Sequence, residues 1–194
     1  MDKTARTYHP IEKALASRWS PRAFSDRLAD GAVVASMFEA ARWSPSASNL
    51  QPWGFVYATR CTEDFDRLCN CLNEQNALWA RRAALLVLAL ANPTKPDGNA
   101  NLHARYDLGQ AVAHLTFQAS AEGLHVHQMA GFDAAKACSA MNIPPHLDVV
   151  SAIAIGYLGE IEVLPEGLQE RERGPRARKP ASSFAFSNRW PDTV

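Results

Sequence analysis

Hydrophobic residues recur along the chain with a helical period in some segments and form short runs in others. Residues 32–42 carry apolar side chains at helical spacing, and Asp30 can cap this helix at its N-terminus. Residues 102–122 form the longest helical pattern, apolar on most sides, and Gly123 predicts its end. Shorter helices are predicted over residues 10–17, 62–72 and 134–141.

Short apolar segments between these patterns predict strands. The unbroken run 83–91 is typical of a strand buried on both faces, and further strands are predicted over 53–59, 124–129 and 149–158. Prolines predict a loop over 44–52 and a loop or extended segment over 18–24. Residues 160–179, which are charged and rich in Gly and Pro, are predicted to form a turn-rich tail. Helices and strands alternate irregularly, which predicts an α+β fold with helices on a central sheet.

Composition narrows the class of protein further. The 194 residues suit a single domain spanning 1–194, and 20 basic against 20 acidic residues give a net charge of zero. Nothing in this balance indicates a nucleic-acid or membrane partner. The first ten residues lack the apolar core of a signal peptide, and the four cysteines match no zinc or disulfide pattern. We therefore expect a cytoplasmic protein without a bound metal.

The first polar motif is the segment Arg18-x-Ser20-x-Arg22. In an extended segment, alternate residues point the same way, so two guanidiniums and a hydroxyl would share one face. Such a face suits an anionic, oxygen-rich ligand such as a phosphate. A solvated edge with ordinary surface arginines is the alternative.

The second polar motif is the loop from Ser44 to Trp53. The amides of Asn49 and Gln51 each offer a donor and an acceptor, which matches the edge of a pyrimidine-like ring. Pro45 and Pro52 would stiffen the loop, so little order would be lost on binding. A polar connector without a ligand is the alternative.

The third polar motif is the cationic run Arg176-x-Arg178-Lys179 in the C-terminal tail. It is interpreted as a phosphate clamp or, alternatively, as a solvated charge run partly neutralised by Glu170 and Glu172.

The sequence alone leaves the roles of two further features open. His125 and His127 would face one side of a strand, as a structural pair, as residues near a cofactor, or as two ligands of a zinc ion. Trp79 precedes the buried strand and is either a core residue or a wall of a pocket.

Together and in this order, the motifs resemble those of the FMN-dependent nitroreductase family. Arg18–Phe24 resembles the family's R-x-S-x-[RK]-x-F opening, and Ser44–Trp53 resembles its S-P-S-x-x-N-x-Q-P-W loop. The motifs that follow at the family's spacing are Asp107-x-Gly109, Gly131-Phe132-Asp133, Ile155-Gly156-Tyr157 and Arg176-x-Arg178-Lys179-Pro180. The resemblance implies a dimeric nitroreductase-like fold, with a central, mostly antiparallel sheet flanked by helices.

The resemblance also implies a binding site for FMN. Arg18, Ser20, Arg176 and Arg178 are expected to hold its phosphate and ribityl end. FMN itself would carry the chemistry, so no side chain is expected to be catalytic.

The flavin ring is expected to meet other residues. The resemblance places Arg22 near N1 and the C2 carbonyl, and Asn49 on the pyrimidine edge. Backbone amides near Ala130 and Gly131 would face N5 and the C4 carbonyl, and the 44–53 loop would approach the partner subunit's cofactor. The complete set expected to bind the cofactor is Arg18, Trp19, Ser20, Arg22, Pro45, Ser46, Ala47, Ser48, Asn49, Gln51, Met129, Ala130, Gly131, Arg176 and Arg178.

The implied activity is an oxidoreductase working in a ping-pong cycle. NADH or NADPH would reduce FMN, and a small acceptor (a nitroaromatic, quinone or enone-like compound) would then take the electron pair. A homodimer with FMN at its interface is expected, and the apolar helix agrees with it, although a core helix in a monomer explains that pattern nearly as well. The alternatives are a flavin storage or sensing module, or a related flavoenzyme that dehalogenates or fragments flavin.

Two departures concern the substrate side of the site. Residues 92–105 form only a brief loop where larger relatives build lids, which predicts an open pocket or one completed by the partner chain. Gln128, Met129 and Ala130 stand where many family members have a proline and an acidic residue. The sequence leaves open the physiological acceptor, the lid residues and the choice between NADH and NADPH, because the chain lacks a glycine-rich dinucleotide fingerprint.

Overall fold

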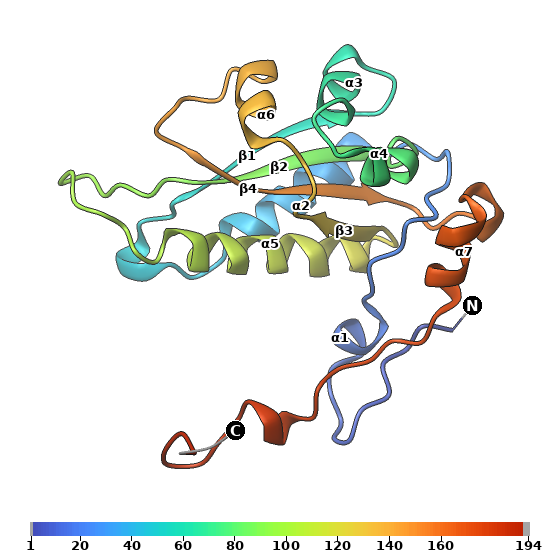
Figure 1. Cartoon of the computed structure of the whole chain (residues 1–194). Helices are drawn as coiled ribbons and strands as arrows, with labels where there is room; N and C mark the ends of the chain where they lie inside the picture. Colours follow the sequence, from blue (N-terminus) through green and yellow to red (C-terminus); the bar gives the residue numbers. More distant parts are fainter. Residues whose placement is uncertain (1, 192–194) are drawn as a thin grey trace.

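The computed structural model describes residues 2–191, in which a four-stranded sheet carries helices on both faces (Figure 1). The strands are β1 (Trp53–Thr59), β2 (Leu85–Ala91), β3 (His125–Met129) and β4 (Asp148–Gly156). They lie in the order β1-β2-β4-β3, and every neighbouring pair is antiparallel. The predicted α+β fold with a central antiparallel sheet is confirmed.

Strand β2 lies inside the sheet, and every one of its residues is buried. Leu86, Leu88 and Leu90 face one hydrophobic core, and Leu85 and Val87 face the other, as the period of two in a strand requires. Because both faces are covered, the strand needs an unbroken apolar sequence. The predicted buried strand over 83–91 is confirmed, with Leu85 as its first residue.

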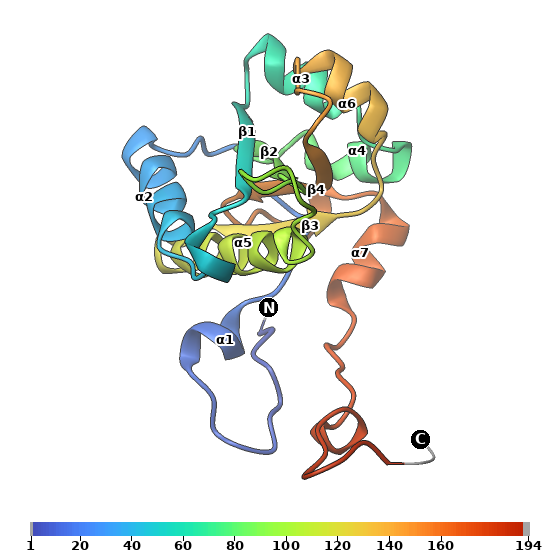
Figure 2. The same cartoon turned by 90° about the vertical axis from the view of Figure 1, so that its left-hand side faces the viewer.

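Helices α2 (Gly31–Arg42) and α5 (Ala104–Ala121) cover one face of the sheet (Figure 2). The carboxylate of Asp30 accepts the N–H of Ala32 at 2.8 Å, which confirms the predicted cap. Gly123, at φ +77°, follows the end of α5 in the left-handed region that favours glycine. Helix α5 buries one face against the sheet and α2, and its other face is polar, small or exposed.

The opposite face carries α3 (Glu63–Cys69), α4 (Glu74–Ala80) and α6 (Ala134–Ala140). Helix α3 is shorter than the predicted 62–72 at both ends. Thr62 is its N-cap and accepts the N–H of Phe65 at 3.2 Å, and the helix ends at Cys69. Helix α4 was not predicted, since its apolar residues, 77–80, are consecutive and do not recur at helical spacing. Its cap is Asn73, whose side chain accepts the N–H of Asn76 at 2.8 Å.

The two ends of the chain lie side by side below the sheet. The elements there are α1 (Lys13–Ser17), α7 (Glu166–Arg173) and the 3-10 turns Ile161–Val163 and Ala181–Ser183. Helix α7 corrects the prediction of an irregular tail over 160–179. Pro165 begins it, and Leu168 and Glu172 point inward. The sequence did not predict this helix because it is highly charged and buries only one apolar side chain, that of Leu168.

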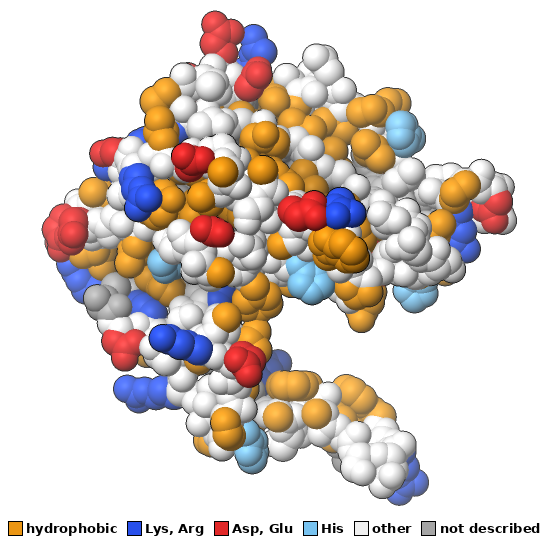
Figure 3. Space-filling view, turned by 180° about the vertical axis from the view of Figure 1, so that it is seen from behind, with side chains coloured by type: hydrophobic (Ala, Val, Ile, Leu, Met, Phe, Trp, Pro, Cys, Tyr) orange, Lys and Arg blue, Asp and Glu red, His pale blue; other side chains and the backbone are white. Residues whose placement is uncertain are grey.

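The chain ends extend away from the sheet as an arm (Figures 1 and 2). Lys3 Nζ donates to the carbonyl of Gly174 at 2.6 Å, which ties the N-terminal segment to the end of α7. Figure 3 shows an open notch between this arm and the body, with hydrophobic side chains on both of its sides. Within residues 2–191, no helix is both long enough and apolar enough to span a bilayer.

Candidate cofactor site

A cationic cavity of about 180 Å³ lies where the two chain ends meet. Its charged lining consists of Lys3, Arg18, Arg22, Arg171, Arg176, Arg178 and the carboxylate of Glu172. Ser20 and Trp19 also contribute to it. The fold therefore brings together the first and third polar motifs, which stand at opposite ends of the sequence.

The Arg18–Phe24 segment is anchored at its far end. Phe24 is completely buried, and its backbone pairs with Leu158 just beyond β4. Arg18 Nη1 donates to the hydroxyl of Ser20 at 3.2 Å, and both line the cavity together with Arg22. The predicted shared face of these three residues thus agrees with the structure.

Arg176 fastens the C-terminal segment to the N-terminal one. Its Nη1 donates to the carbonyls of Lys3 at 2.6 Å and Ala16 at 2.8 Å. Burial and the charges of Arg176 and Arg178 lower the pKa of Arg18, while burial and Arg178 lower the pKa of Arg176. These like charges repel one another, and a bound anion would relieve the repulsion.

The donor set of this cavity fits a phosphate ester. Guanidiniums present paired N–H groups that match phosphate oxygens, and Ser20 adds a hydroxyl. The phosphate end of FMN, which the sequence resemblance implies, is therefore compatible with the residues present.

The Ser44–Pro52 loop holds an unusual backbone. Ser48, Asn49 and Gln51 have φ values of 52°, 55° and 49°, in the left-handed region that L-residues rarely occupy. Asn tolerates this region best, and each such residue costs about 1–3 kcal/mol elsewhere in proteins. The Gln51 amide donates to the Asn49 carbonyl at 3.1 Å, so part of its predicted ligand-binding capacity is used within the loop.

Two side chains fix this loop. Ser46 Oγ accepts the N–H of Gln51 at 3.0 Å, and Asp107 Oδ2 accepts the N–H of Ala47 at 3.1 Å. Asp107 is 1% exposed and belongs to the first turn of α5. The Asp107-x-Gly109 motif therefore has a local function, which is to hold the predicted pyrimidine-binding loop.

Within one chain, this loop and the cationic cavity lie at opposite ends of α5. The loop is bound at Asp107, whereas Trp19 contacts His125, which follows the end of α5, with ring centroids 6.0 Å apart. Figure 1 shows the segment after α2 at one end of α5, and α1 and α7 beyond the other. A helix of 18 residues is about 27 Å long. The two predicted halves of the site are thus not brought together by a single chain.

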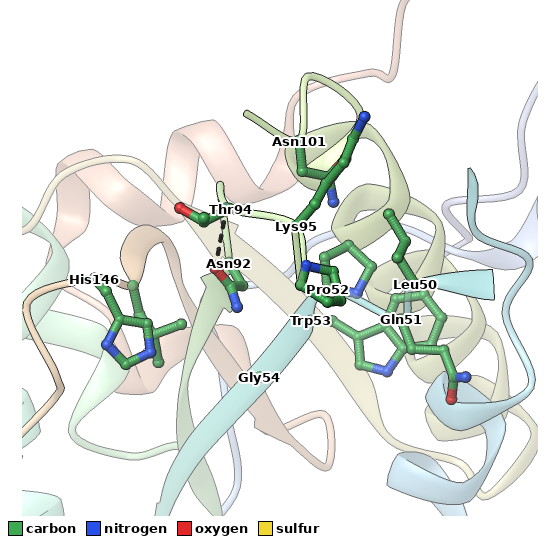
Figure 4. Close-up of a pocket in the computed structure, with 12 residues that line it drawn as sticks. Leu50, Gln51, Pro52, Trp53, Gly54, Asn92, Thr94, Lys95, Asn101 and His146 are labelled. Carbon is green, nitrogen blue, oxygen red and sulfur yellow. Dashed lines mark hydrogen bonds between the residues drawn. The ribbon is translucent and has the colours of Figure 1, made fainter. Parts of the chain in front are cut away.

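A larger cavity, of about 540 Å³, adjoins the other side of the loop (Figure 4). Gln51, Pro52 and Trp53 border it together with residues of the neighbouring Asn92–Asn101 loop, whose Asn92 N–H donates to the Pro52 carbonyl at 2.8 Å. Lys95 and His146 complete its polar lining. Part of the brief loop predicted over 92–105 therefore borders a cavity, and Ala104 and Arg105 already belong to α5. No contact in the cavity identifies a ligand, and the lid residues stay open.

Met129, Ala130 and Gly131 lie at the far end of β3. The carbonyl of Gly131 accepts the N–H of Asn73 at 3.1 Å and Asn76 Nδ2 at 3.0 Å, and Met129 is buried. Residues 130–133 line a third cavity, of about 460 Å³, and not the cationic one. Their approach to a flavin ring therefore stays a prediction.

His125, His127 and Trp79 form an aromatic group between the Arg18–Phe24 segment and the sheet. The Pro21 carbonyl can only accept, so His127 Nδ1 donates to it at 2.9 Å. Burial lowers the pKa of both histidines. Trp79 is 1% exposed and packs on His127 with ring centroids 4.5 Å apart, so it is a core residue and not a pocket wall.

The cysteine pair is part of the core. Cys69 and Cys71 are buried, and burial raises the pKa of Cys69 to about 11. Such a thiol stays protonated at neutral pH and is a poor nucleophile. Among residues 2–191, no group of three His, Cys, Asp or Glu side chains could hold a metal ion.

Sequence reasoning missed one polar residue at the site. Glu172 appeared only as a partial counter-charge beside Glu170, yet Glu172 is 2% exposed while Glu170 lies on the surface. The available signal was the position of Leu168 four residues before Glu172, which puts both on one helix face.

Comparison with known proteins places this architecture in a family. The chain matches the nitroreductase family over residues 15–76 and 62–157. The uncharacterized 15.4 kDa protein in the ask 5′ region of Mycolicibacterium smegmatis is 33% identical over 137 residues, covering 71% of this chain and 91% of that protein.

Two solved structures of FMN-containing proteins have a similar fold. An oxidoreductase containing FMN superimposes with a TM-score of 0.91 at 33% identity, covering 96% of each chain. A putative nitroreductase in complex with FMN from Desulfovibrio desulfuricans superimposes with a TM-score of 0.75 at 22% identity, covering 95% of this chain and 100% of that chain.

The antiparallel sheet flanked by helices defines an α+β protein, and a cationic cavity lies beside one edge of its sheet. Since the family match spans most of the residues that form this fold, the chain belongs to the nitroreductase family.

Proposed function

We propose that this protein is an FMN-dependent oxidoreductase that passes electron pairs from NADH or NADPH to small acceptors such as nitroaromatics, quinones or enone-like compounds. The cationic cavity carries the proposal, because its guanidiniums and the Ser20 hydroxyl suit the phosphate of FMN. Two solved structures of similar fold that contain FMN support it.

The chain's own residues would bind and orient the cofactor. FMN, when bound, would supply the two-electron chemistry. Arg18, Ser20 and Arg178 would hold its phosphate through charge-assisted hydrogen bonds. Arg22 would place a positive charge near the pyrimidine end, where a negative charge develops on reduction. A ping-pong cycle follows if donor and acceptor use the same flavin face in turn.

A second copy of the chain would supply the other half of the site. The Asn49 loop lies at one end of α5 and the cationic cavity beyond the other. If two α5 helices pack across a twofold axis, the loop of one copy approaches the cavity of the other. The separation of the two halves within one chain thus supports the proposed homodimer.

Helix α5 has a face suited to that contact. A stripe of residues three or four apart points away from the sheet, and small residues in it allow close approach of two helices. The stripe consists of Tyr106, Gly109, Ala113 and Phe117, and Leu102 extends it in the turn just before the helix. Leu102 is 90% exposed and Tyr106 is 69% exposed, which is unfavourable for apolar groups in an isolated chain.

The arm adds a second apolar surface. Tyr8 is 90% exposed, Phe184 61% and Trp190 65%, and they belong to segments that extend away from the body. The notch in Figure 3 is open to a second molecule. A partner body seated in the notch would cover these side chains and the α5 stripe together.

Spectroscopy tests the proposed activity. The purified protein should show twin flavin absorbance bands after FMN addition, and anaerobic NADH or NADPH should bleach them until an acceptor is added. A colourless protein that binds no FMN would overturn the proposal. A bound flavin that does not bleach would favour a storage or sensing module, and bleaching without acceptor reduction would favour another flavin reaction.

A variant pair tests the phosphate assignment. Arg18→Ala should weaken FMN binding about tenfold or more, the effect of losing a charge-assisted bond, and leave binding of riboflavin, which has no phosphate, nearly unchanged. Arg67→Ala, an exposed arginine paired on the surface of α3, is the matched control and should bind FMN normally. An equal loss of FMN and riboflavin affinity in Arg18→Ala would contradict the assignment.

A further inference from the structure

Glu172 joins helix α7 to the segment that carries the cationic motif. Its side chain is 2% exposed, and Oε1 accepts the backbone N–H of Arg22 at 2.7 Å and of Ala23 at 3.1 Å. Its other oxygen, Oε2, lies 3.7 Å from Arg22 Nη1. One carboxylate therefore contacts both the backbone and the charged end of Arg22.

The surroundings make this carboxylate unusual. Within residues 2–191, Oε2 has no hydrogen-bond partner, and the Arg22 guanidinium at 3.7 Å is its ion-pair partner. Burial of a carboxylate with one oxygen left without a hydrogen bond is unfavourable. Among the described residues lining the cationic cavity, Glu172 carries the one negative charge, against six positive ones. A hydrophobic residue at this helix position would fill the space, but it would leave two backbone N–H groups without an acceptor.

We propose that Glu172 is a positioning residue of the cofactor site, an inference that rests on the proposed function. Its two backbone hydrogen bonds hold the Arg18–Arg22 segment in its binding conformation before FMN arrives. Its charge compensates the Arg22 guanidinium, so it sets how strongly that cation acts on the flavin ring. Preorganisation of this kind strengthens binding by removing the entropy loss of ordering the segment.

The charge of Glu172 reaches beyond Arg22. It raises the pKa of His125 and of His127, opposing the larger effect of burial. Both histidines lie on β3 beneath the same segment, with His127 bonded to the Pro21 carbonyl. The carboxylate thus faces the Arg18–Phe24 segment, β3 and the cavity from its position on α7.

Two variants separate hydrogen bonding from charge. Glu172→Gln keeps an oxygen of the same reach for the N–H groups of Arg22 and Ala23 but removes the charge. Glu172→Ala removes both. In FMN-free protein, amide hydrogen exchange at Arg22 and Ala23 should be slow in the wild type, somewhat faster in Glu172→Gln and fastest in Glu172→Ala.

FMN affinity and the flavin reduction potential are two further readouts. A residue with a structural role alone would not change them differently in the two variants. Glu172→Ala should raise the Kd of FMN about tenfold, whereas Glu172→Gln should change it by less than about threefold. In Glu172→Gln the uncompensated Arg22 should favour reduced over oxidised flavin about threefold, a potential about 15 mV more positive for a two-electron couple. Glu170→Gln, exposed on the same helix, is the matched control and should behave as wild type.

Several results would overturn the inference. One is an amide exchange rate at Arg22 and Ala23 in Glu172→Ala that equals the wild-type rate. Another is an FMN affinity of that variant that equals the wild-type affinity. If Glu172→Ala does not fold, an unchanged flavin potential in Glu172→Gln would overturn it instead. A wild-type chain that binds no FMN would overturn the proposed function, and with it the cofactor role of Glu172. The exchange readout needs no cofactor, so it would still show whether Glu172 holds the Arg18–Arg22 segment.

Discussion

The buried carboxylate of Asp107 accepts the backbone N–H of Ala47 at 3.1 Å, and so fixes a strained loop to the first turn of α5. The loop contains three non-glycine residues with positive φ, among them Asn49. Strain of this kind persists only where surrounding contacts determine the backbone. Asp107 is one such contact, and its removal should release the loop.

Asp107→Ala is expected to lower the free energy of unfolding by about 1–3 kcal/mol, because the half-buried Ala47 N–H loses its acceptor. FMN affinity should fall about tenfold as Asn49 loses its fixed position. Urea unfolding and FMN titration measure both effects. Asp66→Ala, on the surface of α3, is the control, and equal effects of the two substitutions would refute the role of Asp107.

Gly131 leaves no room for a side chain. A Cβ at this position would overlap the side-chain amide of Asn73 and lie 2.7 Å from Nδ2 of Asn76. Gly131→Ala should therefore displace the start of α4 and destabilise the protein by about 1–3 kcal/mol. Gly167→Ala, with open space around its Cβ in α7, should instead stabilise it by up to about 1 kcal/mol. Urea unfolding curves for both variants measure these stability changes. The prediction would be contradicted if Gly167→Ala destabilised the protein while Gly131→Ala did not.

His127 should make stability fall in mild acid. Burial is the main cause that lowers its pKa below 6.5, with Arg22 adding to it and the Pro21 carbonyl and Glu172 opposing it. The unfolded chain therefore binds a proton that the folded chain resists, so stability is full above about pH 6.5 and is lost as the pH falls below it.

His127→Gln is the test of that dependence, since Gln can still donate to the Pro21 carbonyl but does not titrate. The urea midpoint of the variant should fall less between pH 7 and pH 5 than that of the wild type, with His125 retaining part of the slope. His9→Gln, which changes an exposed histidine, should keep the full wild-type slope. Identical slopes in all three proteins would exclude His127.

The sequence predicted the sheet and its long helices because these elements repeat a period many times. The run 83–91 and the pattern 102–122 each contain enough apolar positions to separate strand from helix. Helices α4 and α7 escaped prediction for different reasons. The apolar residues of α4 are consecutive and do not recur at helical spacing, and α7 buries a carboxylate where a helical pattern leads one to expect an apolar side chain.

Prediction of the site was limited by what a single chain contains. Motif order pointed to Arg18, Ser20, Arg176 and Arg178, and the fold does gather them around one cavity. The spacing of Leu168 and Glu172 indicates that Glu172 lies on the inward face of α7, but no local pattern reveals its partners, two backbone N–H groups distant in sequence. The position of Asn49 relative to the cavity is likewise a question of assembly and not of local sequence.

Subunit complementation would show whether two chains share each site. Arg18→Ala damages the cationic half, and Asn49→Ala damages the loop half, so each variant alone should bind FMN poorly. In a mixed dimer, one site combines both damaged halves and the other combines both intact halves. Unfolding and refolding an equimolar mixture should therefore restore normal affinity at about one quarter of all sites, if subunits associate at random.

FMN titration of the mixture measures that fraction against each variant refolded alone. If each chain held a complete site, mixing would restore nothing, and the shared site would be excluded.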